Sequence, residues 1–202
     1  MPPTAMKAVR KTAASPGAQL VEVPVPPVGP RDVLVKIELA AICGSDKHVY
    51  HWDSATGAAF AKPFTMGHEF AGRVLEVGPQ VTSVKPGDLV AGETHQPCGQ
   101  CATCLTDNPH ICPNTRLVGR HIDGCFAEYT VIPDVCARKV AESIPPEQVA
   151  LLEPLGVAVH ALTDLEVSGK SLAVLGAGPI GLMSVAAGRA LGATRVFATA
   201  RS

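Results

Sequence analysis

Four cysteines in one short stretch are the residues whose types and spacing point most clearly to chemistry. They are separated by two, two and seven residues, at Cys98, Cys101, Cys104 and Cys112. Thiolates so close in sequence can converge on one tetrahedral Zn²⁺, and four sulfur ligands leave no open position for a substrate. Disulfides are the alternative, but seven cysteines are an odd number and no secretory signal precedes them. The spacing therefore predicts a structural zinc.

A second group of potential metal ligands is dispersed along the chain. Cys43 lies in the segment AICGSDKH, His68 and Glu69 lie in GHEFAG, and Glu153 follows two leucines. One thiolate, one imidazole and one carboxylate would leave a fourth position for water or a substrate oxygen, as a catalytic zinc requires. The alternative is that these residues share no metal, because a single cysteine, histidine or glutamate is often structural.

A glycine-rich turn is the third candidate site. Residues 176–181 fill the pattern G-x-G-x-x-G with Gly176, Gly178, Pro179, Ile180 and Gly181. They follow a predicted strand and open a predicted helix, which is the context in which this motif binds the pyrophosphate of a dinucleotide. A purely structural glycine turn is the alternative.

The residues after this unit bear on the choice of dinucleotide. An acid at the end of the second strand would bind the ribose 2′-hydroxyl of NAD. Ala200 occupies that position here, and Arg201 and Ser202, which follow it, could hold the 2′-phosphate of NADP. Arg201 could instead be a solvated charge, or an acid could lie just beyond it. The sequence leaves NAD and NADP both open.

The elements that must position these residues fall into two groups. Residues up to about 146 predict short strands at 33–39, 72–77 and 126–132, separated by proline and glycine turns. From residue 146 the pattern predicts a helix continuing through 162, a buried strand at 171–175, a helix at 180–191 and a strand at 195–199. We expect a mixed α/β chain, with a β-barrel domain over residues 1–150 and a βαβ unit over 151–202.

The βαβ unit has two strands, whereas a complete dinucleotide-binding sheet has five or six. We therefore expect the chain to be the N-terminal part of a longer enzyme and inactive by itself. Its 202 residues are 47% hydrophobic and 17% charged, as in a folded globular protein. A net charge of −1 gives no basic face for nucleic acid, and no segment is apolar enough to span a membrane. Free thiols suit a reducing cytoplasm.

Taken together, these motifs resemble the zinc-dependent medium-chain alcohol dehydrogenases, from about Met6 to the end of the chain. The resemblance implies a GroES-like β domain that carries two zinc ions, followed by a Rossmann domain that binds NAD or NADP. It implies that Cys43, His68 and Glu153 hold the catalytic zinc and that Glu69 can approach this metal. It also implies a homo-oligomer at full length.

Finer features resemble the threonine dehydrogenases within this family. Tyr50, Trp52 and Asp53 fit their Y-x-W-D pattern, and His95 matches a histidine near the substrate in those enzymes. Trp52 and His95 are therefore candidate substrate residues. Polyol and butanediol dehydrogenases share most of these features, so a sugar alcohol or a diol is the alternative substrate.

The same resemblance implies a mechanism. Zinc would lower the pKa of a secondary alcohol, and the nicotinamide would take its hydride. The Ser45 hydroxyl would receive the proton and His48 would pass it outward, because histidine titrates near neutral pH. His48 could instead be a surface residue. A different class of function, a zinc-stabilised scaffold without catalysis, would bind one zinc instead of two.

Overall fold

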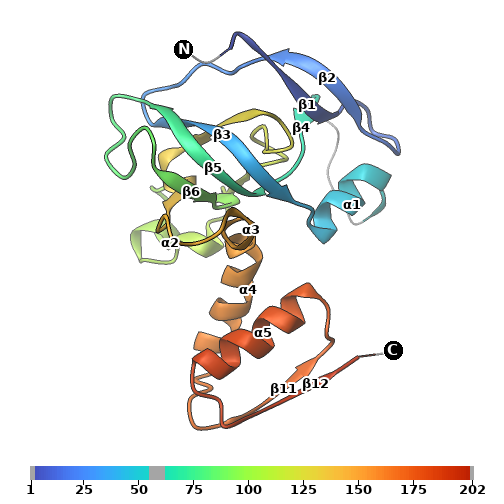
Figure 1. Cartoon of the computed structure of the whole chain (residues 1–202), viewed down its shortest axis with the longest axis vertical. Coiled ribbons are helices and arrows are strands. Elements are labelled where there is room, and N and C mark those ends of the chain that lie inside the picture. Colours follow the sequence, from blue (N-terminus) through green and yellow to red (C-terminus); the bar gives the residue numbers. More distant parts are fainter. Residues whose placement is uncertain (1–2, 55–61, 201–202) are drawn as a thin grey trace. The chain divides into compact units, whose positions relative to one another are not determined.

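The computed structural model describes residues 3–54 and 62–200. The chain divides into two compact units, Met1–Ala150 and Leu151–Ser202, drawn in Figure 1. The first unit contains these elements: β1 (Ala5–Lys11), β2 (Gln19–Pro24), β3 (Asp32–Ala41), α1 (Gly44–His51), β4 (Phe64–Thr65), β5 (Glu69–Val77), β6 (Leu89–Gly92), β7 (His95–Gln96), α2 (Ala102–Leu105), η2 (Pro109–Ile111), β8 (Arg116–Leu117), β9 (Tyr129–Pro133), η3 (Asp134–Cys136), β10 (Ala137–Lys139) and α3 (Pro146–Val149). The second contains α4 (Leu152–Thr163), β11 (Ser171–Leu175), α5 (Pro179–Ala190) and β12 (Arg195–Thr199).

The first unit is built on antiparallel sheets. Within the described residues, five strands form a sheet in the order β10-β6-β5-β3-β9, and β2-β1-β4 form a smaller one. The bridge between Ala8 and Ala127 and the hydrogen bond from Val9 N to the Phe126 carbonyl, at 2.7 Å, connect β1 to the segment just before β9. Strand β3 carries two register shifts against β5, and such irregularities bend a strand, as the expected barrel-like sheet requires.

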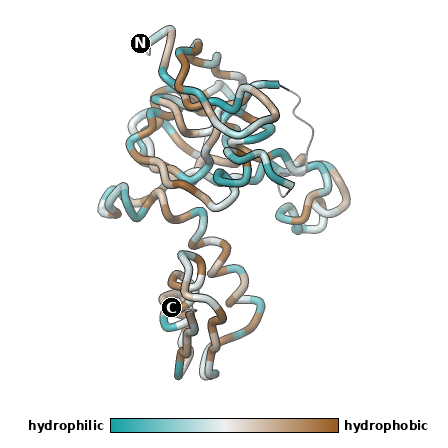
Figure 2. Tube along the Cα trace, turned by 90° about the vertical axis from the view of Figure 1, so that its right-hand side faces the viewer, coloured by the Kyte–Doolittle hydropathy of each residue, from teal (hydrophilic) through white to brown (hydrophobic). Residues whose placement is uncertain are grey.

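The core of the first unit lies on the inner face of the larger sheet. Val33, Val35, Phe70, Val90 and Ile132 are almost completely buried there. Hydrophobic and hydrophilic stretches alternate along the chain of this unit in Figure 2. The residue-by-residue alternation of antiparallel strands with one buried face is found in β1, where Met6 and Ala8 are buried and Ala5 and Lys7 are exposed.

The second unit is a βαβ element. Strands β11 and β12 are parallel and in register from Ser171–Arg195 to Leu175–Thr199. Helix α5 packs against both strands and against α4. Leu162, Val167 and Ala187 form the buried centre of the unit. The strands expected at 171–175 and 195–199 are confirmed, and so is the helix between them, which begins one residue earlier than predicted and ends one residue earlier.

The helix expected from residue 146 through 162 is wrong as one continuous element. Helix α3 ends at Val149, and α4 begins at Leu152 after a residue, Leu151, with non-helical ψ near 0°. In an uninterrupted helix Pro154 would occupy an interior position, where it has no N–H to donate and its ring clashes with the preceding turn. The break places Pro154 in the first turn of α4, where proline is tolerated.

The predicted strands of the first unit are confirmed with different ends. Strand β3 covers Asp32–Ala41 and β5 covers Glu69–Val77, so both extend beyond the apolar runs that indicated them. Strand β9 begins at Tyr129, three residues later than expected. Among the described residues, no helix is both long and apolar enough to cross a bilayer.

Candidate functional site

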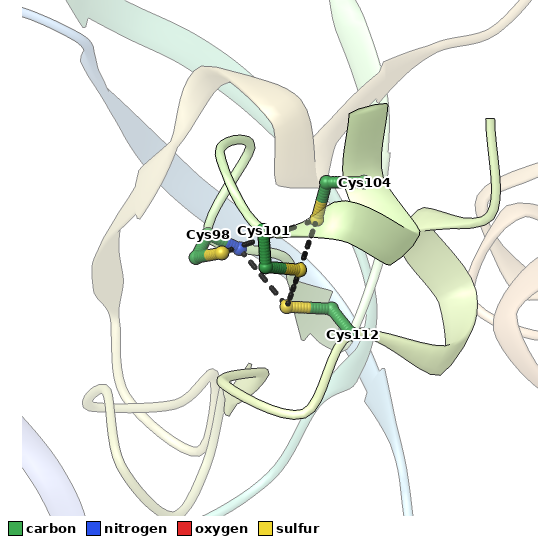
Figure 3. A group of neighbouring side chains, drawn as sticks. All are labelled: Cys98, Cys101, Cys104 and Cys112. Carbon is green, nitrogen blue, oxygen red and sulfur yellow. Dashed lines mark hydrogen bonds between the residues drawn. The ribbon is translucent and has the colours of Figure 1, made fainter. Parts of the chain in front are cut away.

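The four cysteines of the predicted structural site converge. Their sulfur atoms point toward one another in Figure 3, and all four are reduced. The Sγ–Sγ distances are 3.4 Å between Cys101 and Cys104, 3.7 Å between Cys101 and Cys112, and 4.0 Å between Cys98 and Cys104. Four thiolates around one zinc at about 2.3 Å stand about 3.8 Å apart. The cluster therefore has the dimensions of a zinc site and not those of disulfides.

Hydrogen bonds and burial shift the pKa values of these cysteines in a way that favours binding of a cation. The Thr103 hydroxyl lies 2.9 Å from Cys101 Sγ and lowers the pKa of that thiol to about 6, with help from the backbone N–H of Cys104. Burial and the neighbouring Cys101 raise the pKa of Cys104 to about 12. Thiols that share a proton in this way repel one another once ionised, and a divalent cation relieves that repulsion.

The second cluster joins Cys43, His68 and Glu69. Their Sγ, imidazole nitrogen and carboxylate oxygen atoms lie within 4.8 Å of one another. Strand pairing produces this proximity, because Ala41 at the end of β3 is the register partner of Glu69 at the start of β5. Cys43 caps the N-terminus of α1, immediately after β3. The antiparallel β3–β5 pair thus brings together candidate ligands that are far apart in sequence.

The backbone around His68 is fixed by glycines. Gly67 has φ +86°, and a β-carbon there would collide with the ring of Phe126. The loop of Gly119 and Gly124 packs directly on the Gly67 peptide, and Cys125 N donates to the Gly67 carbonyl at 3.0 Å. This close packing fixes the position of the peptide immediately before His68.

The charges of the second cluster fit a cation. Burial raises the pKa of the Cys43 thiol, and the nearby Glu69 carboxylate raises it further, while hydrogen bonds from Ser45 oppose both effects. Glu69 is 4% exposed and the side chain of His68 is 12% exposed. A partly buried thiol beside a buried carboxyl group cannot ionise together with it at low free-energy cost unless a positive charge lies between them. The donor set, one sulfur, one nitrogen and one oxygen, is one that zinc accepts.

Asp46 supports this cluster, and the sequence did not single it out as a functional residue. One of its oxygens accepts a hydrogen bond from Cys43 N at 2.9 Å, and the other lies 3.8 Å from His68 Nδ1. Burial raises the pKa of its carboxyl group, whereas the backbone N–H of Cys43 and the charge of His68 lower it. Its position three residues after the helix cap is the sequence signal that could have identified it.

Helix α1 carries the residues expected to move the proton. Ser45 lies in its first turn and hydrogen-bonds to Cys43. His48 lies one turn further on, and its Nδ1 atom is 2.7 Å from an oxygen of Asp53. Trp52, the candidate substrate residue, ends the helix in the left-handed conformation at φ 52°. Ser45 and His48 therefore lie on the helix that begins directly after Cys43, a candidate metal ligand.

His95 lies in β7, just before the cysteine cluster, with about half of its side chain exposed. Its Nδ1 atom is 2.9 Å from Glu93, and this contact lowers the pKa of the Glu93 carboxyl group. Glu93 was not identified from the sequence, because neither its type nor its spacing marks a motif.

The remaining predicted site residues belong to the second unit or lie outside the described residues. Glu153 lies in the first turn of α4. Gly176 has φ +114°, Gly178 caps α5 and Pro179 is its first residue. A β-carbon on Gly181 would collide with the Gly176 carbonyl, as expected where helix and strand pack closely. Arg201 and Ser202 lie outside the described residues.

Comparison with known families agrees with this geometry. Residues 29–142, more than half of the chain, match the model of the alcohol dehydrogenase GroES-like domain. The chain belongs to the alcohol dehydrogenase family. This membership confirms the resemblance inferred from the cysteine lobe, the GHE segment and the glycine turn.

Individual members of the alcohol dehydrogenase family match along almost the whole chain. The L-threonine 3-dehydrogenase of Caldanaerobacter subterraneus subsp. tengcongensis is 46% identical over 193 residues, which are 96% of this chain and 56% of that protein. The crystal structure of a candidate zinc-binding dehydrogenase from Sinorhizobium meliloti 1021, bound to NADP, superposes with a TM-score of 0.89 at 37% identity and covers 99% of this chain and 57% of that one.

The 2R,3R-butanediol dehydrogenase of Bacillus subtilis superposes with a TM-score of 0.79 at 31% identity, over 96% of this chain and 57% of that one. This alcohol dehydrogenase chain thus spans about half the length of the relatives it matches.

Proposed function

We propose that this chain supplies the substrate and zinc sites of a zinc-dependent dehydrogenase that oxidises a secondary alcohol with NAD or NADP, and that L-threonine is its substrate. The observation that carries the proposal is the convergence of Cys43, His68 and Glu69 within 4.8 Å, immediately before the helix that holds Ser45 and His48. Similarity to proteins named L-threonine 3-dehydrogenase favours threonine as the alcohol. The activity is proposed for the full-length protein.

Two zinc ions fit the donor groups of this chain. The four cysteines of the lobe would hold a structural ion. Cys43, His68 and Glu69 of the first unit would surround a catalytic one, and Glu153 as a further ligand stays a prediction from the sequence. When bound, the catalytic zinc would act as a Lewis acid that lowers the pKa of the substrate alcohol.

The side chains of the first unit would handle the substrate and the proton. Asp46, which faces His68 Nδ1 at 3.8 Å, would favour coordination through Nε2. Ser45 would receive the alcohol proton and His48 would pass it to solvent. Trp52 and His95 would contact the rest of the substrate. In the second unit, the N-terminus of α5 and its glycine turn would hold the cofactor pyrophosphate.

Initial rates of the full-length protein test this proposal. Threonine, sorbitol and 2,3-butanediol would each be offered with NAD and with NADP. We predict turnover of threonine that is lost in Cys43→Ser. Turnover of butanediol or sorbitol alone would assign the chain to the polyol and butanediol dehydrogenases, whose structures it also resembles. Two bound zinc ions with turnover of no alcohol would contradict the proposed activity, and one bound ion would favour a scaffold.

A cytoplasmic location, a homo-oligomeric assembly, a domain boundary at residue 150 and the lack of nucleic-acid or membrane partners remain predictions from the sequence. Gel filtration of the full-length protein would test the assembly directly.

A further inference from the structure

The His48–Asp53 pair depends on a specific turn at the end of helix α1. Trp52 adopts the left-handed conformation, φ 52° and ψ 46°, and its N–H donates to the His48 carbonyl. The chain reverses there, and Asp53 N also approaches the His48 carbonyl, at 3.4 Å. As a result, the Asp53 carboxylate lies 2.7 Å from His48 Nδ1.

A buried lysine ties the last turn of α1 to the loop after β1. The Lys11 side chain is completely buried, and its Nζ atom donates to the carbonyl oxygens of Ser15 at 2.5 Å, Gly17 at 2.9 Å and Tyr50 at 3.0 Å. The same ammonium group lies 5.2 Å from the centre of the Trp52 ring. One ammonium hydrogen thus binds the last turn of α1, at Tyr50, and the other two bind the loop after β1.

The geometry determines the proton positions on His48. An ionised carboxylate accepts hydrogen bonds and donates none, so the short contact requires the hydrogen on Nδ1. In the neutral imidazole, Nε2 then carries the lone pair and is the atom that can accept a proton. The side chains of His48 and Asp53 are 53% and 41% exposed, and an exposed ion pair adds little to stability.

We propose that Asp53 is a positioning residue that holds His48 with its hydrogen on Nδ1, so that Nε2 receives the proton released by the substrate alcohol. This inference rests on the proposed function, because it concerns the proton path of that reaction. Nε2 takes one proton from the hydroxyl relay, the resulting imidazolium is paired with the Asp53 carboxylate, and the same proton then leaves for solvent. The histidine and the carboxylate return unchanged.

The tautomer can be measured on the present chain, without turnover. Long-range ¹H–¹⁵N correlation of the histidine rings should show His48 with its hydrogen on Nδ1, and Asp53→Ala should move the hydrogen to Nε2. Glu93→Ala is the matched control, since it removes a similar carboxylate from His95 and should leave the His48 signals unchanged. His48 signals that are the same in Asp53→Ala and the parent chain would overturn the proposal.

Kinetics of the full-length protein test the consequence. Asp53→Ala should lower kcat about tenfold and leave KM within about twofold, because the residue acts through a general base and not on substrate binding. Asp53→Glu should restore most of kcat, and the double variant with His48→Ala should be no slower than His48→Ala alone. Asp53→Asn, which keeps the shape of the turn, should also be slower.

An unchanged kcat in both Asp53→Ala and Asp53→Asn, or losses that multiply with His48→Ala, would refute the positioning role. Failure of the proposed function has a different signature, namely a parent protein that turns over no alcohol while its His48 tautomer still responds to Asp53→Ala.

Discussion

Gly119 lies so close to Gly67 that a β-carbon on Gly119 would stand 2.6 Å from the Gly67 carbonyl oxygen. The contact joins the loop after β8 to the peptide before His68, and it admits no side chain from the loop. A residue without chemistry of its own thereby fixes the backbone of a proposed zinc ligand.

Gly119→Ala should therefore destabilise the protein. Gly119 also has φ +79°, which costs an alanine about 1–2 kcal/mol before any collision is counted. Gly87→Ala is the control, since Gly87 has φ +93° but open space around its α-carbon. Urea unfolding should show a loss at least about 1 kcal/mol larger for Gly119→Ala. Equal losses would mean that the Gly67 contact contributes nothing.

Cys101 should be the most reactive thiol of the metal-free cysteine lobe. Its pKa is lowered to about 6, so it is a thiolate above pH 6, while the pKa of Cys104 is raised to about 12 and this thiol stays protonated. At pH 7.5, iodoacetamide should alkylate Cys101 well before Cys104, and the rate should fall below pH 6. Mass spectrometry with fragmentation would assign the modified residue.

Thr103→Val supplies the control for this reactivity, because it removes the hydroxyl that stabilises the Cys101 thiolate. Alkylation of Cys101 at pH 7.5 should slow in that variant, and zinc should protect the whole cluster. Equal rates at Cys101 and Cys104 in the metal-free chain would contradict the assigned proton positions.

Cys112→Ser should remove one zinc per chain. Cys112 is buried, its sulfur lies 3.7 Å from Cys101, and it accepts a hydrogen bond from Cys98 N at 3.4 Å. Loss of a metal present at about 1,000 times its dissociation constant removes about 4 kcal/mol of stabilisation. Elemental analysis and thermal unfolding would detect both effects. Cys136→Ala, a buried thiol outside both clusters, should leave the zinc content unchanged.

Lys11→Met should destabilise the first unit by more than the loss of one exposed charge would. The substitution leaves three backbone carbonyls without the donor that the ammonium provides, at a cost of about 2–4 kcal/mol. Lys7→Met, on the same strand but exposed, should change the free energy of unfolding by less than about 0.5 kcal/mol. Similar losses in the two variants would show that the buried ammonium contributes nothing specific.

Local patterns in the sequence predicted much of the fold. The strands at 171–175 and 195–199 were located to the residue because short apolar runs end there at turns. The break before Pro154 was missed because the apolar spacing continues across it, although the proline ring prevents one continuous helix.

The arrangement of the site was harder to predict from the sequence than the fold was. Close spacing revealed the cysteine lobe, whereas Cys43 meets Glu69 only through the pairing of β3 with β5, which no local pattern encodes. Asp46 and Glu93 act on their neighbours at hydrogen-bond distance, and Asp53 acts through a left-handed turn. Such contacts depend on backbone geometry that residue types alone do not specify.

Zinc content and threonine turnover, measured on the same preparations of the full-length protein and of Cys43→Ser, test the central claim most directly. We predict two zinc ions and threonine oxidation for the parent protein, and one zinc ion and no measurable turnover for Cys43→Ser. Retention of two zinc ions and of turnover in Cys43→Ser would contradict the assignment of the Cys43 cluster as the catalytic metal site.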